Sequence, residues 1–311
     1  MKRALVSLVF SLHLISLAVA GVKTDLQENG LIGPVQTVRV EDAQFSSQSG
    51  QWVEGRRRPM TTITYDIRGN KIEEIAPDSK TLYTYNAQEN LSAIVSYDPN
   101  RSLCQFGYPC DAEGRKLETR LSYDAQGRKL ETRLLYFDGT PDQKIVYTYD
   151  DKGHLIEEVT SDRGGLIGKM VYTYDDQGHL LKEDVHGPGD GFKYRSVHTY
   201  DEQGKRIATT NYYTHGPALG IEKVVTTYDS QGNILELTTY YTEKIIDEDK
   251  EDRSIPPPAK RLYNYEFDAH GNWVKQIETR CLSETSQLVC EPFTVTYRTI
   301  TYYTEAETPS H

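Results

Sequence analysis

The stretch Val146–Val159 reads VYTYDDKGHLIEEV, and Lys169 to Val185 repeats it as KMVYTYDDQGHLLKEDV. In each copy aromatic residues and threonine alternate up to an aspartate, and a period of two is typical of a β-strand. The Asp-x-x-Gly that follows fits a type I turn, because the carboxylate can accept a backbone N–H two residues on and glycine tolerates a positive φ. An apolar residue three positions after the glycine continues into a return strand. Each copy therefore predicts one β-hairpin.

The phrase recurs along most of the chain with a modal spacing of about 25 residues. The aligned positions are Asp66, Asn86, Asp111, Asp124, Asp150, Asp175, Asp201, Asp229 and Asp268. An isolated hairpin is marginal in water, so the copies must pack side by side to shield their tyrosine rings. We therefore expect an all-β fold, an antiparallel β-meander of about twenty short strands that forms a curved or coiled sheet.

Eight of the nine units keep both the aspartate and the glycine of the turn, whereas the unit at Asn86 lacks the glycine. Calcium loops concentrate several acidic side chains within one loop, whereas each turn here offers one or two, so we expect turn capping rather than cation binding. The structural turn residues are Asp66, Gly69, Asp124, Gly127, Asp150, Gly153, Asp175, Gly178, Asp201, Gly204, Asp229, Gly232, Asp268 and Gly271.

The first twenty residues have a composition of their own. Lys2 and Arg3 precede an apolar run ending in Ala18-Val19-Ala20, which is typical of a secretory signal peptide cleaved after Ala20. A transmembrane anchor is the alternative, but polar residues interrupt a segment barely long enough to span. No second apolar stretch of spanning length occurs, so we expect a signal peptide at 1–20, a single β domain at 21–311, and a secreted or periplasmic product without stable membrane insertion.

Charge and cysteine usage narrow the partners and the compartment. Removing Lys2 and Arg3 leaves 35 − 2 = 33 basic against 46 acidic residues, a formal charge of −13 that repels phosphate backbones, so nucleic acid is not an expected partner. The cysteines lie in two close pairs, Cys104 with Cys110 and Cys281 with Cys290, and export favours two local disulfides, although three connectivities are formally possible. A four-thiolate metal site would need shorter spacing.

One segment interrupts the repeat. Residues 244–260 hold a charge cluster and Pro256-Pro257-Pro258, which cannot continue a strand and predict an exposed loop. The run DEDKEDR within it could attract a basic partner, but charge runs are usually solvated loops.

Units such as YTYDDKGHL, YTYDDQGHL, HTYDEQGKR and TTYDSQGNI resemble the YD repeats of the rearrangement-hotspot (RHS) family, and the resemblance covers roughly residues 61–276. It implies a YD-repeat sheet of a short secreted bacterial member without a toxin domain. The large members close into a shell around a toxin, which takes many more units, so neither the cage nor self-cleavage is carried over.

Candidate chemistry is sparse. His186 and His215 follow successive units in HGPGDG and THGPALG, and a rim pair could bind metal, but without a third ligand at defined spacing, Gly-Pro turns with exposed histidines explain them more simply. No triad phrase, H-E-x-x-H, P-loop or dinucleotide fingerprint occurs, so we expect no catalytic residue, no metal and no cofactor. The chain is expected not to be an enzyme.

Three functions remain open at the level of sequence. The first is a non-catalytic binding or scaffold protein that engages glycan or protein through an extended Tyr-rich β surface. The second is an accessory or remnant of an RHS-type toxin-delivery system. The third is a glycan-cleaving enzyme, which would need two carboxylates facing each other across a groove.

Overall fold

The computed structural model describes residues 24–98, 111, 115–188, 192–213, 220–241, 258–284 and 287–304. It contains one short helix, α1 (Asp25–Glu28), and nineteen strands. The strands are β1 (Val35–Gln48), β2 (Gln51–Glu54), β3 (Arg58–Tyr65), β4 (Lys71–Ala76), β5 (Ser79–Tyr85), β6 (Leu91–Tyr97), β7 (Arg115–Tyr123), β8 (Lys129–Tyr136), β9 (Pro141–Tyr149), β10 (Leu155–Asp162), β11 (Gly165–Tyr174), β12 (Leu180–His186), β13 (Phe192–Tyr200), β14 (Arg206–Tyr213), β15 (Gly220–Tyr228), β16 (Ile234–Tyr241), β17 (Ala259–Phe267), β18 (Trp273–Glu284) and β19 (Gln287–Tyr302).

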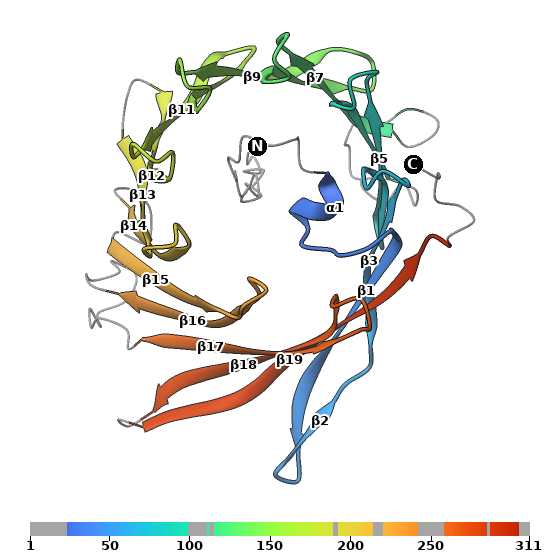
Figure 1. Cartoon of the computed structure of the whole chain (residues 1–311), viewed down its shortest axis with the longest axis vertical. Coiled ribbons are helices and arrows are strands. Elements are labelled where there is room, and N and C mark those ends of the chain that lie inside the picture. Colours follow the sequence, from blue (N-terminus) through green and yellow to red (C-terminus); the bar gives the residue numbers. More distant parts are fainter. Residues whose placement is uncertain are drawn as a thin grey trace, which may run out of the picture.

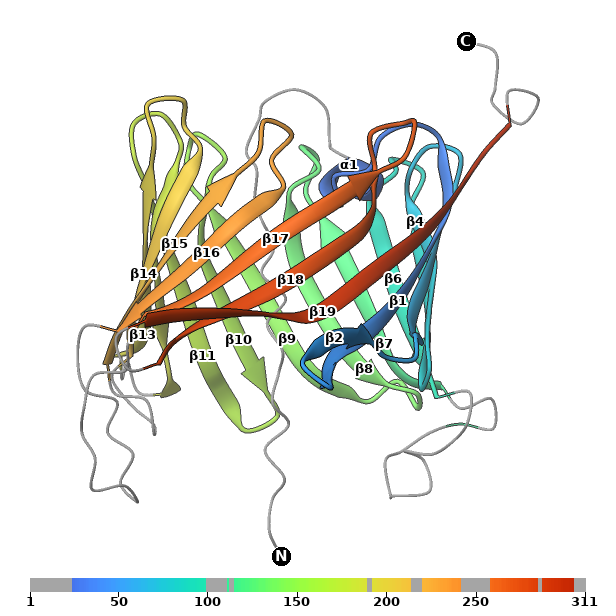
Figure 2. The same ribbon diagram turned by 90° about the horizontal axis from the view of Figure 1, so that it is seen from below.

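The sheet closes on itself. Strands β3 to β19 each pair antiparallel with the next, and β1 pairs with both β19 and β3. Strand β2 pairs only with the far part of β1, from Phe45 to Gln48, so the ring holds nineteen less one, or eighteen, strands. Figure 1 shows this ring end on, and Figure 2 shows its tilted strands from the side.

The prediction of an all-β antiparallel fold is confirmed, whereas the curved or coiled sheet is wrong. The strands are tilted, and successive hairpins are staggered along one another. Together the tilt and the stagger curve the sheet until its first and last strands pair. Across β10–β11, for example, the pairing begins with Glu157 opposite Val171, so residues 172–174 of β11 lie between the paired region and the turns. Strands β5, β7, β9, β13 and β15 also carry three residues beyond the region paired with the preceding strand, and a repeated offset closes a twisted sheet into a barrel.

The tyrosines face the lumen. Helix α1 lies inside the ring (Figure 1), and the Tyr85 hydroxyl donates to the Asp25 carboxylate of α1, which fixes the direction of this face of β5. Paired residues of antiparallel strands point to the same side, and side chains alternate along a strand. The strand registers therefore place the two tyrosines of each phrase in the lumen and the threonine between them on the outer wall.

The last tyrosine of six phrases also links two hairpins. The hydroxyl of Tyr149 donates to the Lys129 carbonyl at 2.9 Å, and that of Tyr174 donates to the Leu155 carbonyl at 2.8 Å. In both cases the acceptor begins the return strand of the preceding hairpin. The same bond joins Tyr85 to Lys71, Tyr123 to Leu91, Tyr200 to Leu180 and Tyr265 to Ile234. The repeated tyrosine thus satisfies a backbone acceptor of its neighbour as well as covering apolar surface.

A compact apolar core exists at one place in the described wall. Leu26, Leu31, Val35, Val38 and Tyr65 are buried together where α1 meets β1 and β3. Elsewhere most described lumen-facing side chains are partly buried, as expected for a barrel too wide for its side chains to fill, although Thr132, Tyr172, Ser196, His198 and Thr239 are buried. Among the described residues, no helix is long and apolar enough to cross a membrane.

Candidate functional site

The Asp-x-x-Gly turns form one rim of the barrel, here named the turn rim. In the turn at Asp150, the backbone N–H of Gly153 donates to the Asp150 carbonyl at 3.0 Å, and the N–H of His154 donates to its carboxylate at 2.7 Å. Gly153 has a φ of 88°, which favours glycine. The turns that start at Asp66, Asp124, Asp175, Asp201, Asp229 and Asp268 share this geometry, with Gly69, Gly127, Gly178, Gly204, Gly232 and Gly271 all at positive φ.

At two turns, the histidine after the turn glycine joins neighbouring units at the turn rim. The His154 ring contacts the second carboxylate oxygen of Asp150 at 2.9 Å and stacks on Tyr174 of the next hairpin, with ring centroids 4.8 Å apart. Burial opposes ionisation of Asp150, but the hydrogen bonds from the His154 backbone and ring outweigh it and lower the pKa of the carboxyl. His179 repeats the arrangement with Asp175 and Tyr200.

Polar side chains recur on the lumen wall a few residues along the strands from the turn rim. The fifth residue after a turn glycine meets the first aromatic residue of the next phrase, and we name these contacts the lumen pairs. They are Glu74 with Tyr83 at 3.0 Å, Thr132 with Tyr147 at 3.0 Å, Glu158 with Tyr172 at 2.8 Å, and Glu183 with His198 at 3.4 Å. The last is an ion-pair distance at which no hydrogen bond forms. The glutamates of these pairs are partly exposed to the lumen, whereas Thr132, Tyr172 and His198 are buried.

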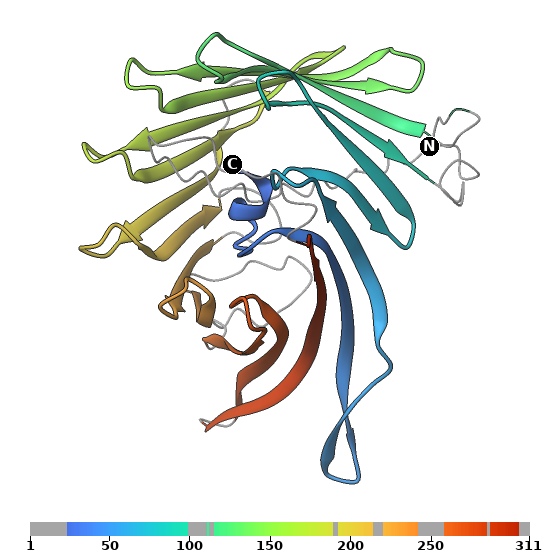
Figure 3. The ribbon, with the colours of Figure 1, turned by 45° about the vertical axis from the view of Figure 1, so that its right-hand side comes forward.

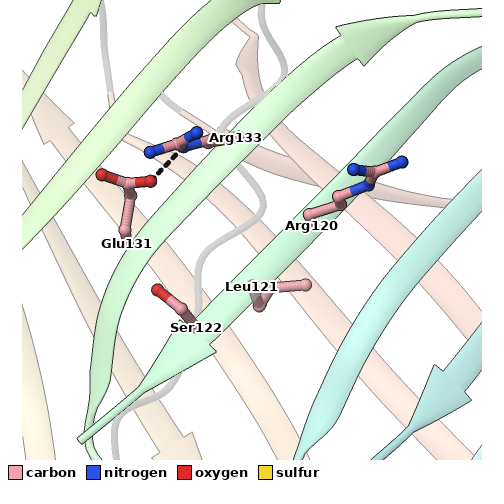
Figure 4. A pocket seen from close by; sticks show the side chains of 5 residues that line it. All are labelled: Arg120, Leu121, Ser122, Glu131 and Arg133. Carbon is pink, nitrogen blue, oxygen red and sulfur yellow. Dashed lines mark hydrogen bonds and ion pairs between the residues drawn. The ribbon is translucent and has the colours of Figure 1, made fainter. Parts of the chain in front are cut away.

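The outer wall carries charge. Cross-strand and same-strand ion pairs lie on the face opposite the lumen pairs, and they include Lys80–Glu73, Arg120–Glu118, Arg133–Glu131, Lys144–Glu131, Lys169–Glu157, Arg195–Asp184, Lys260–Glu236 and Lys275–Glu266. A shallow depression of 270 Å³ lies between β7 and β8 on this wall. Figure 4 shows the side chains that line it, with Glu131 paired to Arg133 and Ser122 nearby. Arg120, Arg133 and Lys144 stand directly opposite one another across three strands, held by the two glutamates.

The remaining predicted residues have mixed outcomes. Cys281 and Cys290 form a disulfide where β18 and β19 pair. Cys104 and Cys110, His215, the predicted signal peptide and most of the 244–260 insertion lie outside the described residues, and β17 begins at Ala259. His186 ends β12 at the rim away from the turns. No group of three or more His, Cys, Asp or Glu side chains within the described ranges could hold a metal ion.

The lumen pairs were missed at the level of sequence. The signal was present, because glutamate stands five residues after the turn glycine in three units, at Glu74, Glu158 and Glu183. The meaning of that position depends on which face of the sheet turns inward, and a hairpin pattern alone does not fix this.

Comparison with known proteins gives limited likenesses. A family model described only as "Uncharacterised protein" matches residues 123–252. No curated relative matches the sequence. A porin-like protein from Bacteroides uniformis is 10% identical, with 87% of this chain and 98% of that chain covered and a TM-score of 0.42. The Photorhabdus luminescens Tc holotoxin pore is 12% identical over 78% of this chain and 19% of its own, with a TM-score of 0.27.

These findings correct the family assignment. The family model that matches is not described as a YD-repeat or RHS family, and the strands close into a barrel. The assignment to the RHS family is therefore wrong, and the toxin-delivery role that depended on it is withdrawn. A recurring Tyr-Asp phrase specifies a hairpin with a linking tyrosine, and that unit is compatible with more than one closed architecture.

The scaffold function and the membrane expectation are also corrected. The extended Tyr-rich surface that was to engage glycan or protein lines the lumen, so it is not an outward docking face, and the groove expected of a glycan-cleaving enzyme is replaced by that lumen. The exclusion of membrane insertion rested on the lack of a second long apolar stretch. That reasoning was wrong, because a closed barrel satisfies its backbone groups between strands and needs no such stretch.

Proposed function

We propose that the chain is a barrel of the bacterial cell envelope whose lumen passes small water-soluble solutes. The observation that carries the proposal is the closed ring of eighteen strands with polar lumen pairs, since barrels of about 16 to 18 strands leave an aqueous channel. An envelope location agrees with the porin-like barrel and with the predicted export. We also propose that the mature chain begins after Ala20 and lies in the periplasm or outside the cell. The same proposal includes no enzymatic activity and no cofactor.

The outer wall favours a second candidate, an aqueous chamber that stands in the periplasm. The lipid-facing band of a membrane barrel is apolar, and a lysine or arginine at its middle costs about 2–4 kcal/mol. Glu118, Arg120, Glu131 and Arg133 lie on the outer face in the middle of the wall between the two rims. Such pairs are better accommodated with water on both sides of the wall.

Planar-bilayer recording of the purified mature chain tests the passage and separates the two candidates. Stepwise conductance that persists at neutral pH supports a membrane passage. The absence of bilayer conductance, together with modification of a lumen thiol by a small reagent when the protein is in solution, supports the chamber. A lumen thiol that no small water-soluble reagent reaches would overturn both, because both require water in the lumen.

A further inference from the structure

The segment Thr24–Val35, here named the strap, crosses the turn rim on the lumen side. It contains α1 and leads into β1, and Figure 3 shows α1 inside the ring near β1 and β3. A capping box holds the start of α1, in which the Gln27 backbone N–H donates to the Thr24 hydroxyl and the Gln27 side chain accepts from the Thr24 backbone N–H. The strap is thus an ordered element with a defined seat.

One half of the strap is bound to the first turn of the barrel. The Leu26 N–H donates to the Gly69 carbonyl at 3.0 Å, and the Lys71 N–H donates to the Asp25 carboxylate at 2.7 Å. A Cβ on Gly69 would meet the Thr24 hydroxyl oxygen at 2.9 Å and the Leu26 Cβ at 3.2 Å. Glycine at position 69 therefore has two roles: it allows the positive φ of the turn, and it leaves room for the strap.

The other half is bound to the last turn, about 240 residues away along the chain. The Ile32 N–H donates to the Asn272 side-chain oxygen at 2.7 Å, and the Asn272 side-chain nitrogen donates to the Ile32 carbonyl at 2.8 Å. Asn272 is 2% exposed. The backbone N–H of Tyr303, just beyond β19, donates to the Pro34 carbonyl at 2.8 Å. A single short segment thus ties the β3–β4 turn to the β17–β18 turn.

The strap spans the point where the ring is closed. In the ring of described strands, β1 and β19 are neighbours that no turn or loop joins, because they come from opposite ends of the chain. The apolar core around Leu26, Leu31 and Tyr65 lies beside the same seam. A seam without a covalent link is the natural place for a hydrogen-bonded wall to open.

We propose that the strap is a latch that keeps the barrel shut at the β1–β19 seam, and that its release opens the wall there. The proposal goes beyond the passage of solutes and does not depend on it. An opened seam would admit a cargo larger than either rim allows. Failure of the bilayer experiment therefore leaves the latch to be judged by its own measurement.

The test compares two strap variants with two matched controls in the full mature chain. Asn272→Ala removes both bonds to Ile32 and one to the Tyr302 hydroxyl. Asn233→Ala removes a side-chain bond to Asp229 at the equivalent position of another turn, where the described residues include no hydrogen bond to the strap. Gly69→Ala places a Cβ against the strap, whereas Gly153→Ala, at a φ of 88° against 89°, meets nothing within 4 Å. The measured quantity is amide hydrogen exchange, strand by strand.

The latch predicts that exchange in β1 and β19 rises about tenfold in each strap variant relative to its control, while β10 to β13 keep their rates. A disulfide engineered by Thr37→Cys with Thr301→Cys, whose hydroxyls are 2.6 Å apart across the seam, should reverse the rise. Unchanged exchange in β1 and β19, an equal rise in all strands, or a rise that survives the engineered bridge would each overturn the proposal. The bridged background also keeps the test usable if a variant folds poorly.

Discussion

The linking tyrosine makes its own contribution to stability. Tyr174→Phe keeps the ring but removes the bond to the Leu155 carbonyl, which then lacks this donor within a partly buried wall. We expect the free energy of unfolding to fall by about 1 kcal/mol, the usual net value of one hydrogen bond. Denaturant titration measures it. Tyr240→Phe, at an outer-wall ring that is 41% exposed, is the control and should change little.

The turn aspartates predict a stability that depends on acid pH. The pKa of Asp150 is lowered in the folded chain, so its contribution is fully present above the unfolded pKa and is lost as the pH falls through the folded value. Asp150→Asn should therefore destabilise the barrel at neutral pH, and the difference from the parent should shrink below the ordinary aspartate pKa of 3.8. Thermal melts across pH 2 to 7 check this, and a pH-independent difference would contradict it.

Contacts between successive hairpins also contribute to stability. A Cβ on Gly178 would meet the His154 Nε2 at 3.2 Å, whereas a Cβ on Gly232 meets nothing within 4 Å, and both glycines have a φ near 90°. Gly178→Ala and Gly232→Ala thus share the backbone strain, and only the first disturbs the neighbouring turn. We expect Gly178→Ala to cost about 1 kcal/mol more in unfolding free energy. An equal loss of unfolding free energy in the two variants would show that the His154 ring moves aside without cost.

The disulfide stabilises the end of one hairpin. Cys281 and Cys290 lie opposite each other, and Leu282 and Val289 pair beyond them towards the tip of β18–β19. Replacing both cysteines by serine should increase amide exchange from Leu282 to Val289, because the bond that restricts this short loop is lost. Exchange in the strands of the barrel ring should stay slow. Loss of protection around the whole ring would mean that the bond supports closure instead.

Sequence reasoning reaches as far as the hairpin. The alternation Tyr172-Thr173-Tyr174 and the turn from Asp175 to Gly178 contain every local determinant of strand, turn and return strand. The role of the tyrosine hydroxyl was not predictable, because its acceptor lies in the preceding hairpin and depends on the stagger between them. The function of Glu158 and Glu183 was hidden for the same reason.

Closure is a property of the whole molecule. It depends on the accumulated tilt and stagger of eighteen strands and on pairing between residues such as Thr37 and Thr301, which no local pattern records. An open sheet and a barrel share every hairpin, so the sequence led to the wrong overall shape. Closure also decides which face is inside, and with it whether the tyrosines form a docking surface or the lining of a lumen.

The most direct test uses two adjacent residues on opposite faces of β7. Leu121 lies opposite Thr132 of the lumen wall, and Ser122 lies opposite Glu131 of the outer wall. The account predicts that Leu121→Cys and Ser122→Cys both react with a small maleimide above the level of the parent chain, and that only Ser122→Cys reacts with a long polyethylene-glycol maleimide. Equal reaction of both thiols with the long reagent would contradict a closed barrel, and an inert thiol at position 121 would contradict a water-filled lumen.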